Sequence, residues 1–591
     1  MRPGHIGKIE KAGDPRGALR RLLPYLRPFL VGVAWVLVCV VLYTGLGLVG
    51  PYLLGVAIDR LVRSKQAAGL AELALWMLSV YVASNLLQAG AGRLMAGISQ
   101  RALKQLRQDL FSRVQSLPVS FFDRNPAGDL LSRLTNDIDA INQAISQNVT
   151  SLVASLLSMA GILVAMFVLD RWLALASLIV VPIMFWFTRF VARYTRKGFR
   201  DLQRDLGQLN GVMEEAISGQ QVQHAFRRKD SALEAFRACN AKVFSAGVYA
   251  NSYALLLMPI TSVLGNLFVI VLAGLGGFLA LSGLVTVGII ATFISYGQNF
   301  VQPLRQLANL YNSIQAALAG AERIFAIVDI PAELDDAPSS EPLGSVRGDV
   351  KFEHVGFGYV PQAVVLRDLS FEAEPGQVTA LVGPTGAGKT TIINLLTRFY
   401  EIHSGRITID GRDIRAIRKA DLRRHLGLVL QDVFLFSGSV LENIRYGRLG
   451  ASDEEVTAAA KLAEADPFIR LLPQGYATQL SERAHNLSQG QRQLIAIARA
   501  VLADPAILIL DEATSSVDTR TEARIQSALL RLMKGRTSFV IAHRLSTIAD
   551  ADQVLVIDAG AVVERGKHAQ LLAKQGVYAR LYASQFKGEA I

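Results

Sequence analysis

Cysteine is scarce in this chain: Cys39 and Cys239 are the two among 591 residues. Two cysteines without a spacing pattern exclude a disulfide framework and a cysteine-based metal site. Cys39 lies inside an apolar run, where a cysteine behaves as a small hydrophobic residue.

Charged residues are also few, at 19%, whereas hydrophobic residues reach 51% and the mean hydropathy is +0.32. Acidic side chains are outnumbered by basic ones, 49 to 61, which gives a net charge of +12. A basic excess fits either nucleic-acid binding or a membrane protein with basic cytosolic segments. The long apolar runs favour the membrane protein, and the length favours more than one domain. No cleavable signal peptide is evident, because the first apolar run follows a polar, basic segment.

The apolar runs are long enough to cross a membrane, which takes about 20 residues in a helix. Few charges interrupt the runs, so an ion pathway is not indicated and a hydrophobic or amphipathic cargo is favoured. Very short turns separate the runs 147–169 and 172–192, and also the runs 254–280 and 284–308, as expected for antiparallel neighbouring helices. The sequence predicts six spans, at residues 29–50, 70–90, 147–169, 172–192, 254–280 and 284–308.

The polar connections 91–146 and 193–253 are rich in arginine and lysine, as is the N-terminus. The positive-inside rule therefore places all three in the cytosol, and the less basic loop 59–69 outside. Both connections show helical periodicity, which predicts that the membrane helices continue into the cytosol, with a turn at Asn125-Pro126. Residues 17–29 mix arginine with leucine and predict an amphipathic helix on the inner membrane face.

The second part of the chain has the composition of a soluble domain. Residues 331–348 are rich in proline, serine, glycine and acids, as linkers are. Strand-like and helix-like runs then alternate, which is typical of α/β domains. We therefore expect a basic tail at 1–16, a six-helix transmembrane domain at 17–330, a linker at 331–348, an α/β domain at 349–585 and a C-terminal tail at 586–591.

The stretch GPTGAGKTT matches the phosphate-binding pattern G-x-x-x-x-G-K-[ST]. A strand-like run, 377–382, precedes it and a helix-like run, 391–399, follows it, which is the context that the pattern requires. Its glycines let backbone N–H groups approach the phosphates, and the helix N-terminus adds a favourable dipole. Lys389 would meet the β- and γ-phosphates and Thr390 a Mg²⁺ ion. The predicted nucleotide-binding residues here are Gly383, Pro384, Thr385, Gly386, Ala387, Gly388, Lys389, Thr390 and Thr391.

Polar residues follow three further strand-like runs. The run ILIL ends in Asp511, which suits Mg²⁺ coordination, and Glu512, which suits a general base acting on water. His543 follows another run and could reach the γ-phosphate, and Gln431 follows a third and could bind Mg²⁺ and water. We therefore predict Glu512, His543 and Gln431 as catalytic residues, and Thr390, Gln431 and Asp511 as metal ligands.

In this order the motifs resemble those of the ATP-binding-cassette (ABC) transporters, and most closely an exporter half-transporter: six membrane helices fused to one P-loop ATPase domain. The resemblance covers about residues 17–585, and LSQGQRQ at 487–493 resembles the family signature, most often LSGGQ. It implies that two ATPase domains meet head to tail, with ATP between the phosphate loop of one and the signature of the other. It assigns Tyr359 to adenine stacking, Asp518 to the dimer interface, and Ser488, Gln489, Gly490 and Gln491 to the partner's ATP.

The function implied by this resemblance is ATP-driven export of a hydrophobic or amphipathic substrate by alternating access. The cofactors would be ATP and Mg²⁺, and the partner a second half-transporter chain rather than a nucleic acid. Segments 121–133 and 217–226 would couple the two domains, in a multi-pass protein of the cell membrane whose ATPase domain and N-terminus are cytoplasmic. Gln489 replaces the commoner glycine, so a homodimer and a heterodimer both stay open. An exporter-fold importer and a non-transporting or regulatory membrane ATPase are the alternatives.

Overall fold

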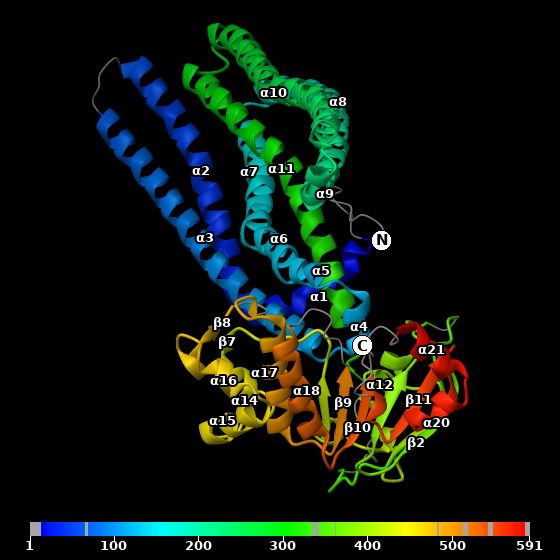
Figure 1. The fold of residues 1–591 in the computed structure, drawn as a ribbon. Coiled ribbons are helices and arrows are strands. Elements are labelled where there is room, and N and C mark those ends of the chain that lie inside the picture. The colour runs from blue at the N-terminus through cyan, green and yellow to red at the C-terminus, as the bar shows by residue number, and fades with distance from the viewer. Residues whose placement is uncertain are drawn as a thin grey trace. The chain divides into compact units, whose positions relative to one another are not determined.

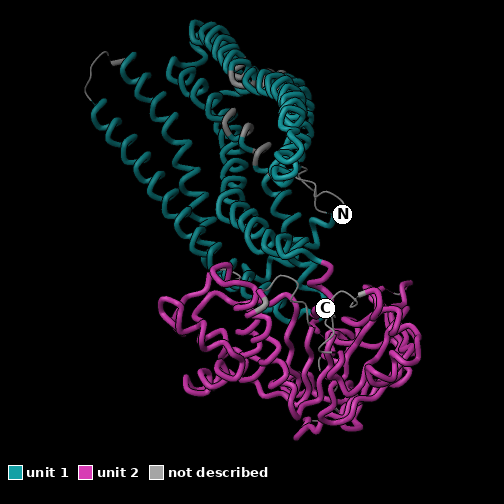
Figure 2. The backbone as a smooth tube through the Cα atoms, in the orientation of Figure 1, with its two compact units in different colours: residues 1–117, 125–331 teal, residues 118–124, 332–591 magenta. Residues whose placement is uncertain are grey.

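The computed structural model describes residues 13–64, 69–333, 336, 342–360, 362–481, 484–511, 518–541 and 548–585. The chain separates into two compact units (Figure 2). The first comprises residues 1–117 and 125–331, and the second comprises residues 118–124 and 332–591.

In the described part of the first unit, every regular element is a helix (Figure 1). Helices α2 and α3 run side by side, and so do the longer α8 and α10. Two π-helical turns interrupt the rod that α5, α6 and α7 build, and these are η2 (Arg133–Asp137) and η3 (Ala144–Asn148). The helices are α1 (Pro15–Leu26), α2 (Leu30–Ser64), α3 (Leu70–Gln115), α5 (Ala127–Ser132), α6 (Ile138–Gln143), α7 (Val149–Leu169), α8 (Arg171–Ser218), α9 (Gln220–Ala225), α10 (Lys229–Leu281) and α11 (Val287–Val328), with a 3₁₀ turn, η1, at Arg27–Phe29.

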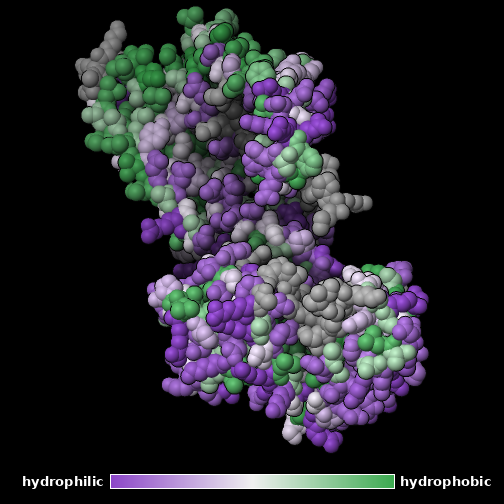
Figure 3. Space-filling model, in the orientation of Figure 1, coloured by the Kyte–Doolittle hydropathy of each residue, from purple (hydrophilic) through white to green (hydrophobic). Residues whose placement is uncertain are grey.

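The predicted membrane spans fall on helices α2, α3, α7, α8, α10 and α11. Among the described residues, three helical stretches are long and apolar enough to cross a membrane: Pro15–Val62, Leu70–Gln115 and Ala127–Leu169. Gly265–Leu281 is a shorter apolar helix. Hydrophobic side chains gather on the surface over α2 and α3, where lipid rather than water is the favourable neighbour (Figure 3).

The tight turns expected between neighbouring helices are present. Asp170 alone separates α7 from α8, and its carboxylate caps α8 by accepting hydrogen bonds from the N–H groups of Trp172 and Leu173 at 2.9 and 2.8 Å. Thr286 caps α11 in the same way. Asp59, from α2, accepts a hydrogen bond from the Gly288 N–H at 2.7 Å and so joins α2 to the beginning of α11. Side-chain caps therefore satisfy backbone groups that these helix ends leave open.

A series of polar pairs joins the α5–α7 rod to the antiparallel α11. Arg323 donates to buried Asp137 at 3.0 Å, Asn148 donates to Ser313 at 2.6 Å, and Ser155 donates to Gln306 at 3.4 Å. As the residue number rises on the rod it falls on α11, so the pairs follow one seam between two helices. These contacts fix the register of the two helices.

The second unit is an α/β fold with a parallel sheet at its centre. The sheet has six strands in the order β12-β11-β3-β10-β9-β6, of which β12 alone is antiparallel to its neighbour. Its strands are β3 (Val378–Val382), β6 (Leu426–Val429), β9 (Ile507–Asp511), β10 (Thr537–Ile541), β11 (Gln553–Asp558) and β12 (Ala561–Gly566). Both faces of this sheet are covered, as expected for parallel strands with continuous apolar runs.

A separate antiparallel sheet, β2-β1-β4-β5, shares one core with α12, while helices such as α17 and α18 share the other core with the opposite face of the parallel sheet. The remaining strands are β1 (Val350–Phe357), β2 (Leu366–Ala373), β4 (Ser404–Ile409), β5 (Arg412–Asp413), β7 (Gly438–Ser439) and β8 (Gln479–Leu480). The helices are α4 (Val119–Arg124), α12 (Lys389–Leu396), α13 (Lys419–Arg424), α14 (Val440–Arg445), α15 (Asp453–Leu462), α16 (Asp466–Ile469), α17 (Gln489–Ala503), α18 (Thr519–Met533), α20 (His568–Ala573) and α21 (Val577–Gln585), with 3₁₀ turns η4 (Ile414–Ala416) and η5 (Gly475–Ala477).

Candidate nucleotide-binding site

The phosphate loop and Asp511 lie where two strands end at one edge of the parallel sheet. In the strand register, Ile541 of β10 lies opposite both Leu381 of β3 and Asp511 of β9, and Leu510 lies opposite Val429 of β6. The carboxyl ends of these strands are therefore neighbours, and ligands of open parallel sheets bind at such an edge. The phosphate loop follows β3 and Asp511 ends β9.

Gln431 lies two residues beyond the end of β6, not at the strand end itself as expected from the sequence, and it is exposed. Glu512 and His543 lie outside the described residues. They follow β9 and β10 in the sequence, by one and two residues respectively. Their predicted roles as base and γ-phosphate contact therefore stay predictions.

The phosphate loop depends on glycine at two positions of left-handed backbone. Gly386 has φ +83° and Gly388 has φ +107°. A Cβ on Gly388 would lie 2.7 Å from Cδ2 of Leu366, whereas one on Gly386 would meet nothing within 4 Å. Gly388 is also the N-cap of α12, so the loop leads directly into the helix N-terminus. Backbone N–H groups there are free to meet an anion.

Lys389, the first residue of α12, folds back over this loop. Its Nζ donates hydrogen bonds to the carbonyl oxygens of Gly383 at 2.6 Å and Pro384 at 3.0 Å. Burial lowers the pKa of Lys389, and the negative charge of Asp511 opposes that shift. The ammonium is thus held beside the loop by weak acceptors that phosphate oxygens can replace.

The three residues predicted to bind Mg²⁺ all carry oxygen donors, which are the ligands that this ion prefers. Thr390 offers a hydroxyl from an exposed position, Asp511 a carboxylate and Gln431 an amide oxygen. Among the described residues no group of three or more histidine, cysteine, aspartate or glutamate side chains could hold a metal. Mg²⁺ suits this sparse all-oxygen set, because it keeps several waters and takes few protein ligands beside substrate phosphates.

Tyr359 lies against the helix that begins at the phosphate loop. Its hydroxyl is 3.1 Å from Oγ1 of Thr391 and accepts a hydrogen bond from Nδ2 of Asn394 at 3.2 Å. Its ring meets Tyr400 edge-on, with centroids 5.0 Å apart. These contacts fix an aromatic ring beside α12, where an adenine could stack on it.

Helix α4, from the segment predicted to couple the domains, groups with this second unit. Arg124 donates to the carbonyl oxygen of Tyr359 at 3.0 Å, and Tyr400 hydrogen-bonds Asp123. Burial and the bond to Asp123 raise the pKa of Tyr400 well above its ordinary value. The α4 segment therefore contacts the residues around Tyr359.

The signature residues form the beginning of α17. Ser488 is its N-cap: Oγ accepts from the Gln491 N–H at 3.3 Å, and the Ser488 N–H donates to Oε1 of Gln491 at 2.9 Å. This capping box explains the pairing of serine and glutamine at this spacing. Gln489 and Gly490 occupy the first turn, at the positive end of the helix dipole.

Asp518 is the N-cap of α18, where its carboxylate accepts from the Thr521 N–H at 3.0 Å. This hydrogen bond lowers the pKa of Asp518, which is exposed and ionised at neutral pH. The predicted place of Asp518 at a dimer interface stays a prediction.

Comparison with known proteins decides the family. Residues 33–304 match the family model of the ABC transporter transmembrane region, and residues 366–515 match the ABC transporter family model. A Bacillus subtilis protein, "Uncharacterized ABC transporter ATP-binding protein YfiC", is 42% identical over 98% of this chain and 96% of its own. The chain belongs to the ABC transporter family. It is an exporter-type half-transporter whose ATPase domain binds ATP and is coupled to transport.

Two further ABC transporters are similar to this chain. A Mycobacterium bovis "Fatty acid ABC transporter ATP-binding/permease protein" is 46% identical over 85% of this chain and 79% of its own. The solved structure of a bacterial Atm1-family ABC exporter with ATP bound is 31% identical, covers 98% of this chain and 100% of its own, and superposes with a TM-score of 0.73.

Sequence analysis missed a partly buried cation in this ABC ATPase domain. Arg499 of α17 donates to the carbonyl oxygens of Asn443 at 3.0 Å and Phe434 at 3.3 Å, and it lies over the ring of Tyr446 at 5.3 Å. Burial lowers its pKa. It ties the signature helix to α14 and to the segment after Gln431. An arginine within the apolar run LIAIARAVLA was the available signal.

Proposed function

We propose that this half-transporter exports a hydrophobic or amphipathic substrate across the cell membrane by alternating access. Two chains would bind two ATP molecules between their ATPase domains. The observation that carries the proposal is the meeting of phosphate loop, Asp511 and Gln431 near one sheet edge, in a chain whose other unit consists of long apolar helices. The similarity to an ATP-bound exporter and to a fatty-acid transporter supports export and a lipid-like cargo.

Each residue at the sheet edge has a proposed part in ATP hydrolysis. Lys389 exchanges its two carbonyl partners for phosphate oxygens, and Tyr359 stacks on the adenine. Thr390, Asp511 and Gln431 would hold Mg²⁺, which neutralises phosphate charge when bound. Glu512 accepts a proton from the attacking water, and His543 positions that water against the γ-phosphate.

The second chain completes each ATP site. The helix N-terminus at Ser488, with Gln489, Gly490 and Gln491, would meet the ATP held by the partner, and Asp518 would face the interface. ATP favours the closed pair of ATPase domains because it binds that state more tightly, and hydrolysis removes this preference. The arginine-rich connections support a cytoplasmic ATPase domain and N-terminus.

Transport into sealed vesicles tests the proposal. The chain is reconstituted into liposomes, ATPase side outward, and supplied with Mg-ATP and a fluorescent long-chain fatty acid, phospholipid or cationic dye. We expect ATP-dependent accumulation of at least one probe in the lumen, and none with the Glu512→Gln variant. Movement of a probe out of the lumen would support an importer. ATP hydrolysis without movement of any probe would support a non-transporting ATPase.

A further inference from the structure

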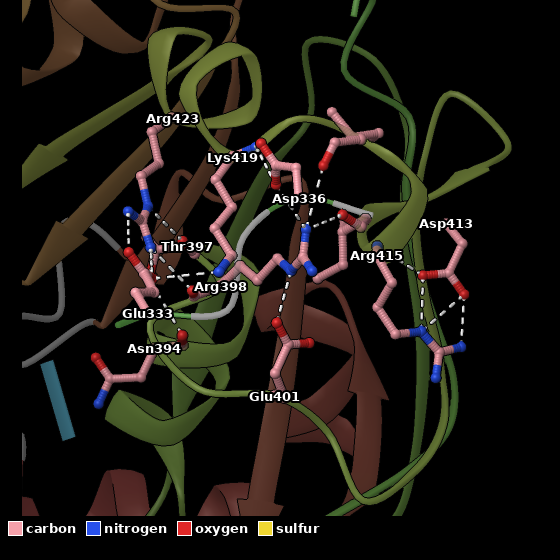
Figure 4. Close-up of polar contacts among 12 residues, drawn as sticks. Glu333, Asp336, Asn394, Thr397, Arg398, Glu401, Asp413, Arg415, Lys419 and Arg423 are labelled. Atoms are coloured by element: carbon pink, nitrogen blue, oxygen red, sulfur yellow. Dashed lines mark hydrogen bonds and ion pairs between the residues drawn. The ribbon is translucent and has the colours of Figure 1, made fainter. Parts of the chain in front are cut away.

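Two acidic residues just beyond α11 are held by a basic cluster of the ATPase domain (Figure 4). Glu333 and Asp336 belong to residues 331–348, which the sequence predicts to be a linker. Both are only partly exposed, with side-chain accessibilities of 28% and 29%. This part of the linker is therefore docked.

Glu333 is bound through both of its carboxylate oxygens. The guanidinium of Arg423 donates to them at 2.7 and 3.3 Å, and Nζ of Lys419 lies 3.7 Å away. The same Arg423 donates to the carbonyl oxygens of Thr397 at 3.3 Å and Arg398 at 3.0 Å. One arginine thus joins the linker to the two residues that directly follow α12.

Asp336 is bound to the neighbouring cation. It lies 3.7 Å from NH1 of Arg398, and its two carboxylate oxygens share the backbone N–H of Lys419, each at 3.1 Å. Arg398 is 7% exposed and donates to Glu401 at 2.8 Å and to the carbonyl oxygens of Ile414 and Ile417, each at 3.2 Å. The site that receives Asp336 is therefore rigidly built.

Arg398 and Arg423 make their contacts at the C-terminal end of α12, the helix that begins at the phosphate loop. Thr397 and Arg398 directly follow α12. The eight residues of this helix include Lys389 and Thr390 at its N-terminus. A helix of that length is about 12 Å long and moves as one rod. Cations near its last carbonyl oxygens also complement the helix dipole. The linker is thus attached to the helix whose other end receives the phosphates.

The chain is also held just before this cluster. Asp329, the C-cap of α11, is paired through both carboxylate oxygens with Arg21 of α1, within the first unit. Only three residues, 330–332, separate Asp329 from Glu333. Four residue steps span at most about 14 Å. The covalent chain therefore keeps the two anchored points within about 14 Å of each other.

We propose that Glu333 and Asp336, with Arg398 and Arg423, form a positioning clamp that links the end of α11 to the phosphate-binding helix of the same chain. Movement of one then displaces the other through a short strap at residues 329–333, which is anchored at Asp329 and at Glu333. This rests on the proposed transport cycle, in which ATP binding moves the membrane helices. None of the four touches the reacting atoms, so they are positioning residues.

A merely stabilising role is the competing explanation, because docked linkers commonly add stability alone. The double variant Glu333→Gln, Asp336→Asn keeps the shape of both side chains and removes their charge. Glu401→Gln is the matched control, since Glu401 also binds Arg398 but lies outside the strap. The full-length variants are compared with the wild type in lipid nanodiscs.

Hydrogen–deuterium exchange of the strap and of α12 is measured with and without a non-hydrolysable ATP analogue and Mg²⁺, beside ATP turnover and the thermal midpoint. In the wild type we expect the analogue to slow exchange in both segments. In the double variant we expect α12 to stay protected, strap exchange to become about tenfold faster and unresponsive to nucleotide, and kcat to fall with little change in KM. The thermal midpoint should move by less than about 3 °C.

Three results would overturn the clamp. The first is strap exchange in the wild type that does not change when nucleotide is added, and the second is strap exchange in the double variant that still changes. The third is a fall in kcat in the Glu401→Gln control as large as the fall in the double variant. None of these measurements needs a transported substrate. If nucleotide-responsive strap exchange and ATP turnover occur but no probe crosses the membrane, the export proposal fails and the clamp stands.

Discussion

Lys389 and Gly383 are joined by a 2.6 Å hydrogen bond from the lysine ammonium to the glycine carbonyl oxygen, across the loop that binds phosphate. The ammonium therefore occupies a fixed place beside the loop. A positioned charge costs less ordering on binding than a mobile one. ATP has only to replace two carbonyl partners with phosphate oxygens.

Lys389→Ala should weaken ATP binding itself rather than the later chemistry. A hydrogen bond between charged partners contributes about 1.5–3 kcal/mol, so we expect Kd for ATP to rise by roughly 10- to 150-fold. Titration with a fluorescent ATP analogue measures this. Lys351→Ala is the control, because Lys351 pairs with Glu372 on β2, away from the loop, and should leave Kd unchanged. An unchanged Kd in Lys389→Ala would remove this lysine from the binding site.

The pH dependence of ATP affinity should reveal the protonation state of Lys389. Burial lowers the pKa of Lys389 below the ordinary 10.5. Phosphate binds the protonated form, so affinity should be full at neutral pH and fall as pH rises through the lowered pKa, before an ordinary lysine would titrate. Lys389→Arg should flatten this fall, because arginine stays charged. Titrations between about pH 7 and 10 check it, and parallel curves for both proteins would exclude Lys389 as the cause.

Much of this site could be predicted because its residues are local in the sequence. The phosphate loop and Asp511 each adjoin an apolar strand, and parallel strands bring such residues to one edge. The strands before them begin and end within a few residues of the expected positions. The offset of Gln431 from β6 arises because that strand has only four residues and ends at Val429.

The clamp at Glu333 and Asp336 could not be predicted in this way. Its arginines lie 90 and 62 residues further along the chain, and single charges on a linker carry no periodic signal. The same holds for Arg21 and Asp329, which are 308 residues apart. Long-range ion pairs depend on which elements the fold brings together, so the structure was needed to find them.

Substitutions at Ser488 should separate its capping role from its proposed role at ATP. Ser488→Ala removes the N-cap of α17 and should lower the free energy of unfolding by about 1 kcal/mol. It should also reduce ATP turnover. Ser488→Asp keeps a good cap, but its negative charge should repel the γ-phosphate of the partner's ATP. We therefore expect Ser488→Asp to unfold like the wild type and still to lose turnover. Full turnover in Ser488→Asp would limit this residue to capping.

The packing of α10 against α11 gives a test of the membrane unit. A Cβ on Gly297 of α11 would lie 1.8 Å from the ring of Phe268, which is 8% exposed, in α10. Gly297→Ala should therefore destabilise the protein by about 1–3 kcal/mol through overpacking. Gly274→Ala is the control, because a Cβ there meets nothing within 4 Å. Thermal unfolding in detergent compares them, and equal midpoints would show that the two helices do not pack at this register.

The chain expressed alone and placed in lipid should hydrolyse ATP, because it carries Glu512, His543 and a signature helix capped by Ser488. Glu512→Gln should still bind ATP but lose turnover by about 10²- to 10⁴-fold, the usual contribution of a general base. Phosphate release and retained nucleotide are measured on both proteins. Turnover that disappears in the variant means a working homodimer in which Gln489 is tolerated. No turnover from a well-folded wild type means that the signature needs a different partner chain, and undiminished turnover in Glu512→Gln means that another group acts as the base.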